Sequence, residues 1–270
     1  MTFIEKLRAA WRNNRSLVCV GLDPDRSKLP QALRGEAHPI FAFNRAIIDA
    51  TCDAVCAYKP QAAFYAGQDA DDELLMTLVY LQQRCPEIPV ILDVKRGDIG
   101  STASMYAREA FDRYGADAVT VNPYMGTDTL KPFLDRADKG VFILCRTSNP
   151  SGAELQSLDC GGQPLYERVA MLARDRWNAN GNAGLVVGAT CPEELARVRA
   201  ICPEMPFLVP GVGAQGGDVA AVLRVGQAAS GDGLVINSSR GIIYAASDDA
   251  FAAAAGRAAR ALRDQINTCR

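Results

Sequence analysis

The sequence predicts an α/β protein made of one TIM barrel, (β/α)8, spanning residues 1–270 as a single domain. Short apolar runs alternate with helical patterns eight times, without a linker or a change of composition between them. Continuous apolar runs are typical of parallel strands that are buried on both faces. The length of 270 residues also suits eight such units, because barrels of this kind usually have about 250 residues. The competing fold, a doubly wound sheet, more typically has about five or six strands.

Each expected strand is an apolar run that stops at a polar residue, a proline or a glycine. The first run ends in Asp23 before Pro24, and the second ends in Lys59 before Pro60. The expected strands are residues 17–23, 55–60, 90–94, 117–123, 140–147, 184–189, 207–211 and 233–238.

Each expected helix has apolar residues at helical spacing. Pro192 fits the first position of a helix, where proline is favoured. The Ala-rich run 252–255 is followed by Leu262 and Ile266, so we expect a packed helix there. The expected helices are residues 2–14, 40–53, 71–84, 102–114, 127–135, 165–178, one from Pro192, 218–225 and one from the Ala-rich run to the C-terminus.

Composition and charge favour a globular protein with no nucleic-acid or membrane partner. Hydrophobic residues make up 49% of the chain and charged residues 22%, with a formal net charge of −2. This balance indicates no basic surface for nucleic acid. The first residues lack the apolar core of a signal peptide, and no apolar run is long enough to span a bilayer. We therefore expect a cytoplasmic protein.

Cysteine and histidine usage narrows the chemistry. The nine cysteines are odd in number and include no Cys-x-x-Cys pair, so we expect reduced, structural thiols. The single histidine, His38, lies in a Pro-rich loop and is expected at the surface. A metal site built from several histidines is thereby excluded, and any proton chemistry falls to Lys, Asp or Glu.

One segment, residues 91–102, combines a buried strand with an unusual set of charges. Asp93 and Lys95 are two residues apart, so they share a face of the strand, and Gly97 and Asp98 follow in the loop. Buried charges are costly unless they are paired. Two interpretations stay open at this point: a structural ion pair that plugs the barrel mouth, or a catalytic ammonium held between carboxylates.

The other strand ends also carry polar side chains, and these should meet at one rim of the barrel. They are Asp23, Lys59, Asn122, Thr147 with Ser148, Gln215 and Arg240. Two loops add a phosphate-binding pattern: the glycine-rich run 210–217, which begins at Pro210 and includes Gly213, and the run 237–241, which includes Ser239. Loop amides there often bind phosphate, and Arg240 would clamp it. The alternative for these glycines is ordinary turn chemistry.

The alternation of Lys59 and Lys95 with Asp93 and Asp98 suggests a specific reaction type. Carboxylates keep a neighbouring lysine protonated even where burial opposes it. Such a lysine can donate a proton to a developing carbanion, and Asp93 beside an anionic substrate group would favour its departure. No cofactor or metal is required by this chemistry.

The chain resembles the orotidine 5′-phosphate decarboxylase family, in particular its longer bacterial branch. The family pattern Asp-x-Lys-x-x-Asp-(x)3-Thr stands here as Asp93, Lys95, Asp98 and Thr102. The runs that also match are Val20-Gly21-Leu22-Asp23-Pro24-Asp25, Tyr58-Lys59-Pro60-Gln61 and Asn237-Ser238-Ser239-Arg240-Gly241.

The resemblance implies decarboxylation of orotidine 5′-phosphate to uridine 5′-phosphate, the last step of de novo UMP synthesis, without metal or cofactor. It implies catalytic roles for four residues: Lys95 as proton donor, Asp93 against the departing carboxylate, Lys59 orienting Asp93 and the ribose, and Asp98 acting across a homodimer interface. The implied substrate-binding residues are Asp23, Gln61, Thr102, Thr147, Ser148, Pro210, Gly213, Gln215, Ser239 and Arg240.

Two rival functions remain at this stage. A magnesium-dependent sugar-phosphate decarboxylase or synthase of the same suprafamily shares the charged strand, but it would need an acid where this chain has Lys59. A barrel that binds a phospho-ligand without catalysis is the second rival. The charged cluster argues against this second rival, because a protein that only binds an anionic ligand gains nothing from an acidic side chain facing it.

Overall fold

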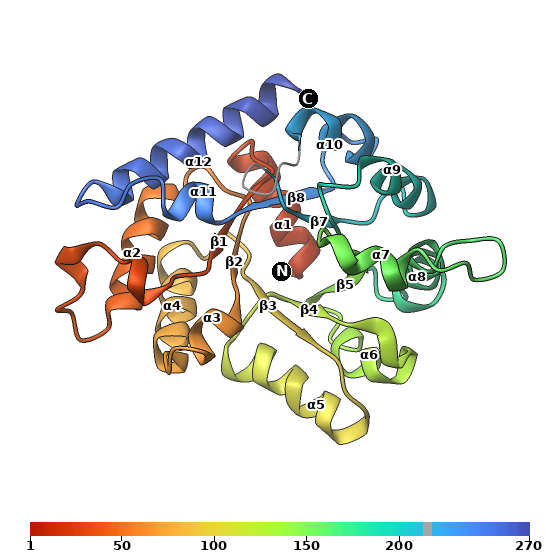
Figure 1. Ribbon diagram of the computed structural model, residues 1–270. Helices are drawn as coiled ribbons and strands as arrows, with labels where there is room; N and C mark the ends of the chain where they lie inside the picture. Colours follow the sequence, from red (N-terminus) through yellow and green to blue (C-terminus); the bar gives the residue numbers. More distant parts are fainter. Residues whose placement is uncertain (213–217) are drawn as a thin grey trace.

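The computed structural model describes residues 1–212 and 218–270. In these residues eight parallel strands form one sheet in the order β2-β1-β8-β7-β6-β5-β4-β3, and the helices surround it (Figure 1). The eightfold barrel expected from the sequence is thereby confirmed. The strands are β1 (Val18–Leu22), β2 (Ala57–Pro60), β3 (Ile91–Arg96), β4 (Ala118–Val121), β5 (Gly140–Arg146), β6 (Ala183–Val187), β7 (Phe207–Pro210) and β8 (Leu234–Ser238).

The barrel closes between β2 and β3 through isolated bridges instead of a continuous ladder. Tyr58 pairs with Val90, and Gln61 pairs with Asp93, both in parallel. The Tyr58 N–H also donates to the Pro89 carbonyl oxygen at 3.0 Å. The two strands that carry the lysines and the central acid are therefore neighbours.

The helices follow the expected order, with additions that have no helical periodicity to predict them. Three are short: α3, α7 and α11, each of four or five residues. The sequence predicts two helices that reach residues 114 and 178. Their α-helical parts, α5 and α8, end at Arg108 and Leu172, and π-helical turns follow at Glu109–Arg113 and Ala173–Trp177. The α-helices are α1 (Phe3–Asn13), α2 (Pro39–Thr51), α3 (Ala62–Ala66), α4 (Asp71–Arg84), α5 (Gly100–Arg108), α6 (Thr127–Leu134), α7 (Ala153–Gln156), α8 (Leu165–Leu172), α9 (Pro192–Ile201), α10 (Val219–Gly226), α11 (Arg240–Ile243) and α12 (Phe251–Thr268).

Helix α1 packs against the beginnings of the strands, at the end of the barrel opposite the predicted site. Thr2 and Glu5 form a capping box at its start. The Phe3 ring meets Phe142 edge-on, and a Cβ on Gly140 would lie only 2.2 Å from that Phe3 ring. This end of the barrel is therefore filled, and the strands' carboxyl ends remain for a ligand.

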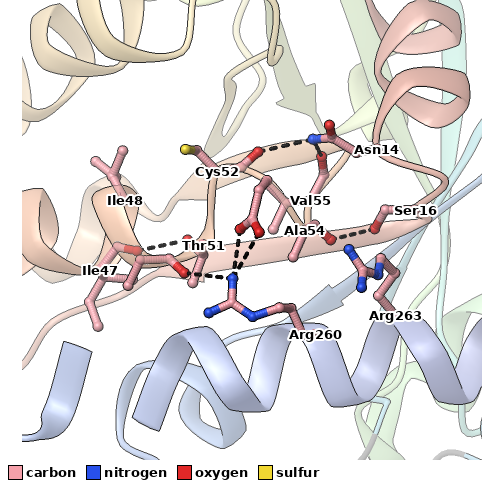
Figure 2. Close-up of polar contacts among 12 residues, drawn as sticks. Asn14, Ser16, Ile47, Ile48, Thr51, Cys52, Ala54, Val55, Arg260 and Arg263 are labelled. Atoms are coloured by element: carbon pink, nitrogen blue, oxygen red, sulfur yellow. Dashed lines mark hydrogen bonds and ion pairs between the residues drawn. The ribbon is translucent and has the colours of Figure 1, made fainter. Parts of the chain in front are cut away.

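The turn between α2 and β2 is fixed by side chains from two other segments (Figure 2). Asn14 donates to the carbonyl oxygens of Cys52 and Val55, and Ser16 donates to that of Ala54. From α12, Arg260 forms an ion pair with Asp53 at 2.8 Å. The connection between α1 and β1, together with the last helix, thus holds the entry into β2, the strand that carries Lys59.

All nine cysteines are free thiols, as expected. Within the described ranges, no helix combines the length and apolar character that a membrane crossing requires.

Candidate active site

A pocket of about 390 Å³ opens at the carboxyl ends of the strands. Its aliphatic wall includes Val186 from β6 and Leu208 from β7. The pocket collects many of the side chains predicted from the sequence. The predicted residues that line it are Asp23, Lys59, Asp93, Lys95, Pro210, Ser239 and Arg240.

Asp93 is the centre of the charged cluster. Its two oxygens accept from different lysines: Lys59 Nζ at 2.9 Å and Lys95 Nζ at 2.7 Å. Lys59 Nζ also lies 4.0 Å from Asp23 Oδ1. Asp93 and Lys59 are only 6% and 4% exposed, whereas the Lys95 side chain is 45% exposed and reaches the open part of the pocket. Lys59, Asp93 and Lys95 thus alternate in space as predicted, but the second acid in this cluster is Asp23 and not the predicted Asp98.

Both buried members of this cluster are held in their charged forms. Burial alone would raise the pKa of Asp93, but the ion pairs with Lys59 and Lys95 outweigh it and hold that pKa far below the usual range. Burial alone would lower the pKa of Lys59, and here Asp23 and Asp93 outweigh it and raise that pKa well above its ordinary value. The pocket therefore contains an ionised Asp93 that forms ion pairs with two lysines.

Lys95 reaches Asp93 through an unusual backbone. Its φ is +47°, in the left-handed region that residues other than glycine rarely adopt. The register between β3 and β4 shifts between Leu92 and Arg96, so the strand bulges at this point. Bulges re-aim side chains near functional sites. The two-residue alternation of a regular strand predicts that Asp93 and Lys95 share a face, but it does not predict the left-handed backbone of Lys95.

Next to this cluster, the ends of β1 and β8 carry buried polar atoms that make no hydrogen bond within the described part of the chain. Asp23 Oδ1, Asn237 Oδ1 and Ser239 Oγ are buried and have no hydrogen-bond partner among the described residues. Gly21 allows Ser239 to lie close to β1, because a Cβ at position 21 would lie 2.7 Å from Ser239 Cβ. Buried polar groups normally find partners, so these atoms suit a polar ligand beside Arg240. The predicted residues Gly213 and Gln215 lie outside the described residues.

Five predicted residues do not line this pocket. Asp98 accepts a hydrogen bond from the Ile99 N–H at 2.7 Å, and Thr102 is exposed on α5. Gln61 pairs with Asp93 through its backbone. The Thr147 hydroxyl donates to Asn149 at 2.6 Å and accepts from Gln156 at 2.8 Å. Ser148 packs so closely on β6 that a Cβ on Gly188 would lie 2.8 Å from its Cα.

Sequence reasoning missed several residues that line the pocket. Tyr244 accepts a hydrogen bond from the Asp25 N–H at 2.7 Å, and Lys28 Nζ lies 5.6 Å from the Tyr244 ring centroid. These contacts join loops that are distant in sequence, so no local pattern reveals them. Thr120 in β4 also lines the pocket. The one sequence feature that could have indicated Thr120 is its position as a polar residue within an apolar strand.

The fold and this ionic pocket define an enzyme of the TIM-barrel class with its site at the carboxyl ends of the strands. The model of the orotidine 5′-phosphate decarboxylase / HUMPS family matches residues 16–255. Proteins named orotidine 5′-phosphate decarboxylase from Ralstonia pickettii and Dechloromonas aromatica are each 58% identical over 270 residues and are covered completely, as is this chain. The structure of Leishmania donovani OMP decarboxylase superposes with a TM-score of 0.86 at 41% identity, covering 100% of this chain and 98% of that one. The chain belongs to the orotidine 5′-phosphate decarboxylase / HUMPS family.

Proposed function

We propose that this protein decarboxylates orotidine 5′-phosphate to uridine 5′-phosphate and CO2, the last step of de novo UMP synthesis. The observation that carries the proposal is the ionised Asp93 between Lys59 and Lys95 in a pocket that also contains Arg240. Full-length relatives at 58% identity that are named for this activity support it.

Lys95 is the proton donor in this proposal. As the bond between the ring and its carboxylate breaks, the electron pair stays on the ring carbon and CO2 leaves. Lys95 then gives a proton from Nζ to that carbon. The ammonium gains interaction energy only as negative charge builds on carbon, which is the condition for lowering the barrier. Its 45% exposed side chain fits a group that contacts substrate.

Asp93 and Lys59 prepare this step. Asp93 would face the departing carboxylate, and a fixed negative charge there disfavours the substrate more than the transition state. The 2.9 Å ion pair with the buried Lys59 keeps Asp93 ionised and in place. This arrangement uses protein charges alone.

The remaining groups bind the two ends of the nucleotide. Arg240, Ser239 and Pro210, together with Gly213 and Gln215, would hold the phosphate, because Arg240 offers a permanent bidentate cation. Asp23 and Gln61 would bind near the ribose. Ser148, with Thr147, would read the pyrimidine from the end of β5, which lies between strands that line the pocket.

We also propose that the chain acts as a homodimer whose sites lie at the interface. Asp98 and Thr102 do not line their own pocket, and they would reach the partner's site. The segments that follow the neighbouring strands β3 and β4, including helix α5, expose large apolar side chains, which an interface would cover. These side chains are Ile99, Met105, Tyr124 and Met125. Nine free thiols fit a reducing compartment, so we place the enzyme in the cytoplasm.

The direct test is an absorbance assay with orotidine 5′-phosphate and purified protein. We expect loss of the substrate's absorbance and formation of uridine 5′-phosphate, with no change after treatment with a chelator. Absence of turnover by folded protein would reject the proposal. Activity that a chelator removes and magnesium restores would favour the metal-dependent rival.

A further inference from the structure

One hydroxyl group connects the backbone of the bulge to the carboxylate of Asp93. Thr120 Oγ1 donates to Asp93 Oδ1 at 2.8 Å. The same oxygen accepts from the backbone N–H groups of Val94 at 3.1 Å and of Lys95 at 3.0 Å. Thr120 is 1% exposed and lines the pocket. A hydroxyl has one proton and two lone pairs, so all of its bonding capacity is used at this point.

This contact lies where the backbone of β3 is irregular. The bulge takes the Val94 and Lys95 N–H groups out of the regular pairing with β4, and Lys95 has a φ of +47°. A strained conformation persists only when its surroundings hold it. Thr120 supplies acceptors for both amides, so it stabilises the bulge that aims Lys95 at Asp93.

The same hydroxyl completes the shell around the carboxylate. Asp93 Oδ1 accepts from Thr120 and Lys95, and Oδ2 accepts from Lys59. Two of these three donors are lysines with roles of their own in the proposed reaction. Thr120 is the neutral one, and it fixes the carboxylate without changing the charge of the pocket.

We infer that Thr120 is a positioning residue that holds Asp93 and Lys95 in their reactive arrangement, an inference that rests on the proposed function. Thr120 acts through these two neighbours and takes no part in proton transfer. Valine at this position would keep the shape of the side chain but would leave two amides without acceptors and would free the carboxylate to rotate. Serine would keep the hydroxyl.

The test compares Thr120→Val with Thr120→Ser. We expect Thr120→Val to lower kcat about tenfold or more while KM and the Kd for uridine 5′-phosphate change less than about threefold, because the loss falls on alignment in the transition state. Thr120→Ser should restore kcat to within about threefold of the wild-type value. Unchanged kcat in Thr120→Val, or equal losses in both variants, would overturn the inference.

Thr51→Val is the matched control. Thr51 is fully buried, and its hydroxyl donates to the Ile47 carbonyl oxygen at 2.7 Å (Figure 2). It is the last residue of α2 and precedes β2, so it lies at the amino ends of the strands, away from the pocket. We expect Thr51→Val to affect stability but not kcat. A fall in kcat equal to that of Thr120→Val would assign the effect to loss of any buried hydroxyl and would overturn the inference.

Hydrogen exchange gives a readout that does not depend on turnover. The amides of residues 94 and 95 should exchange faster in Thr120→Val than in wild type or in Thr120→Ser. Unchanged exchange would overturn the positioning role. If wild-type protein shows no decarboxylation, the proposed function fails, and the exchange rates still decide whether Thr120 holds the bulge.

Discussion

At the scale of single residues, the protein separates two kinds of lysine around one carboxylate. Lys59 is buried and held between Asp23 and Asp93, whereas Lys95 is about half exposed and contacts Asp93 from the open side. A buried lysine with two acidic neighbours is suited to fixing a carboxylate. A lysine with access to the pocket is suited to exchanging a proton with a ligand. The geometry therefore favours Lys95 over Lys59 as the proton donor.

The first prediction concerns Lys95→Ala. We expect decarboxylation to fall by at least about a thousandfold, since general acid and electrostatic effects of this size act chiefly in the transition state. Uridine 5′-phosphate should still bind, measured by calorimetry. Lys131→Ala, which removes an exposed lysine on α6, is the control and should keep full activity. Activity near the wild-type level in Lys95→Ala would reject the proton-donor role.

The second prediction concerns Asp93→Asn and pH. Removing one partner of a buried ion pair should lower the free energy of unfolding by about 3 kcal/mol at pH 7. The folded-state pKa of Asp93 is far below its ordinary value, so its stabilisation is present above the unfolded pKa of about 4 and is lost as pH falls toward the folded pKa. Denaturation of both proteins by urea from pH 7 to pH 3 measures this. A stability difference that does not shrink below about pH 4 would contradict the assignment.

At the scale of helices and strands, close contact of α12 with α2 supports the strand that carries Lys59. Gly256 permits this contact, because a Cβ there would lie 2.6 Å from the Ala50 carbonyl oxygen. The Arg260–Asp53 ion pair nearby joins side chains that are 41% and 61% exposed. Exposed pairs contribute little to stability. Packing at Gly256 should therefore matter more than the ion pair that Figure 2 shows.

The third prediction follows from that comparison. Gly256→Val should lower the free energy of unfolding by about 2 kcal/mol or more, because the added atoms push α12 away from α2. Arg260→Ala should lower it by less than about 1 kcal/mol. Ala253→Val, on the exposed side of α12, is the control, because it adds the same side chain facing solvent; helix propensity itself favours valine over glycine at position 256. Equal losses at positions 253 and 256 would show that the close approach is unimportant.

The sequence was sufficient for the regular elements and for part of the site. Apolar runs predict all eight strands because the apolar residues of each strand are mostly buried on both faces, and the polar strand ends predict the charged cluster. Sequence pattern does not predict α3, α7 or α11, since four or five residues show no helical period. It also does not predict the left-handed Lys95 or the role of Thr120, because both depend on the bulge between β3 and β4.

At the scale of the whole molecule, two of the five predicted residues that do not line the pocket lie close together after β3. Asp98 and Thr102 follow β3 on the side that exposes Ile99 and Met105. A second copy that covers this surface would explain both observations. The complete site would then need two chains, and activity would depend on their association.

The fourth prediction tests this dependence by mixing inactive variants. Lys95→Ala and Asp98→Ala proteins, after subunit exchange, should regain about one quarter of wild-type activity, because half of the dimers are mixed and each mixed dimer has one intact site. Lys95→Ala mixed with Asp93→Asn is the control. Both residues belong to the same half of the site, so no activity should return. Failure of the first mixture, after exchange is demonstrated by mass spectrometry, would indicate sites formed by one chain.

The closure of the barrel has a consequence for how this protein can be engineered. β2 and β3 meet through single bridges, and the Lys59–Asp93 pair spans the same junction. Replacing catalytic side chains by non-catalytic ones often raises the stability of an enzyme and lowers its activity. Here the same charged side chains also hold β2 and β3 together where the barrel closes. A heat-resistant but idle version should therefore be hard to obtain by altering these two side chains.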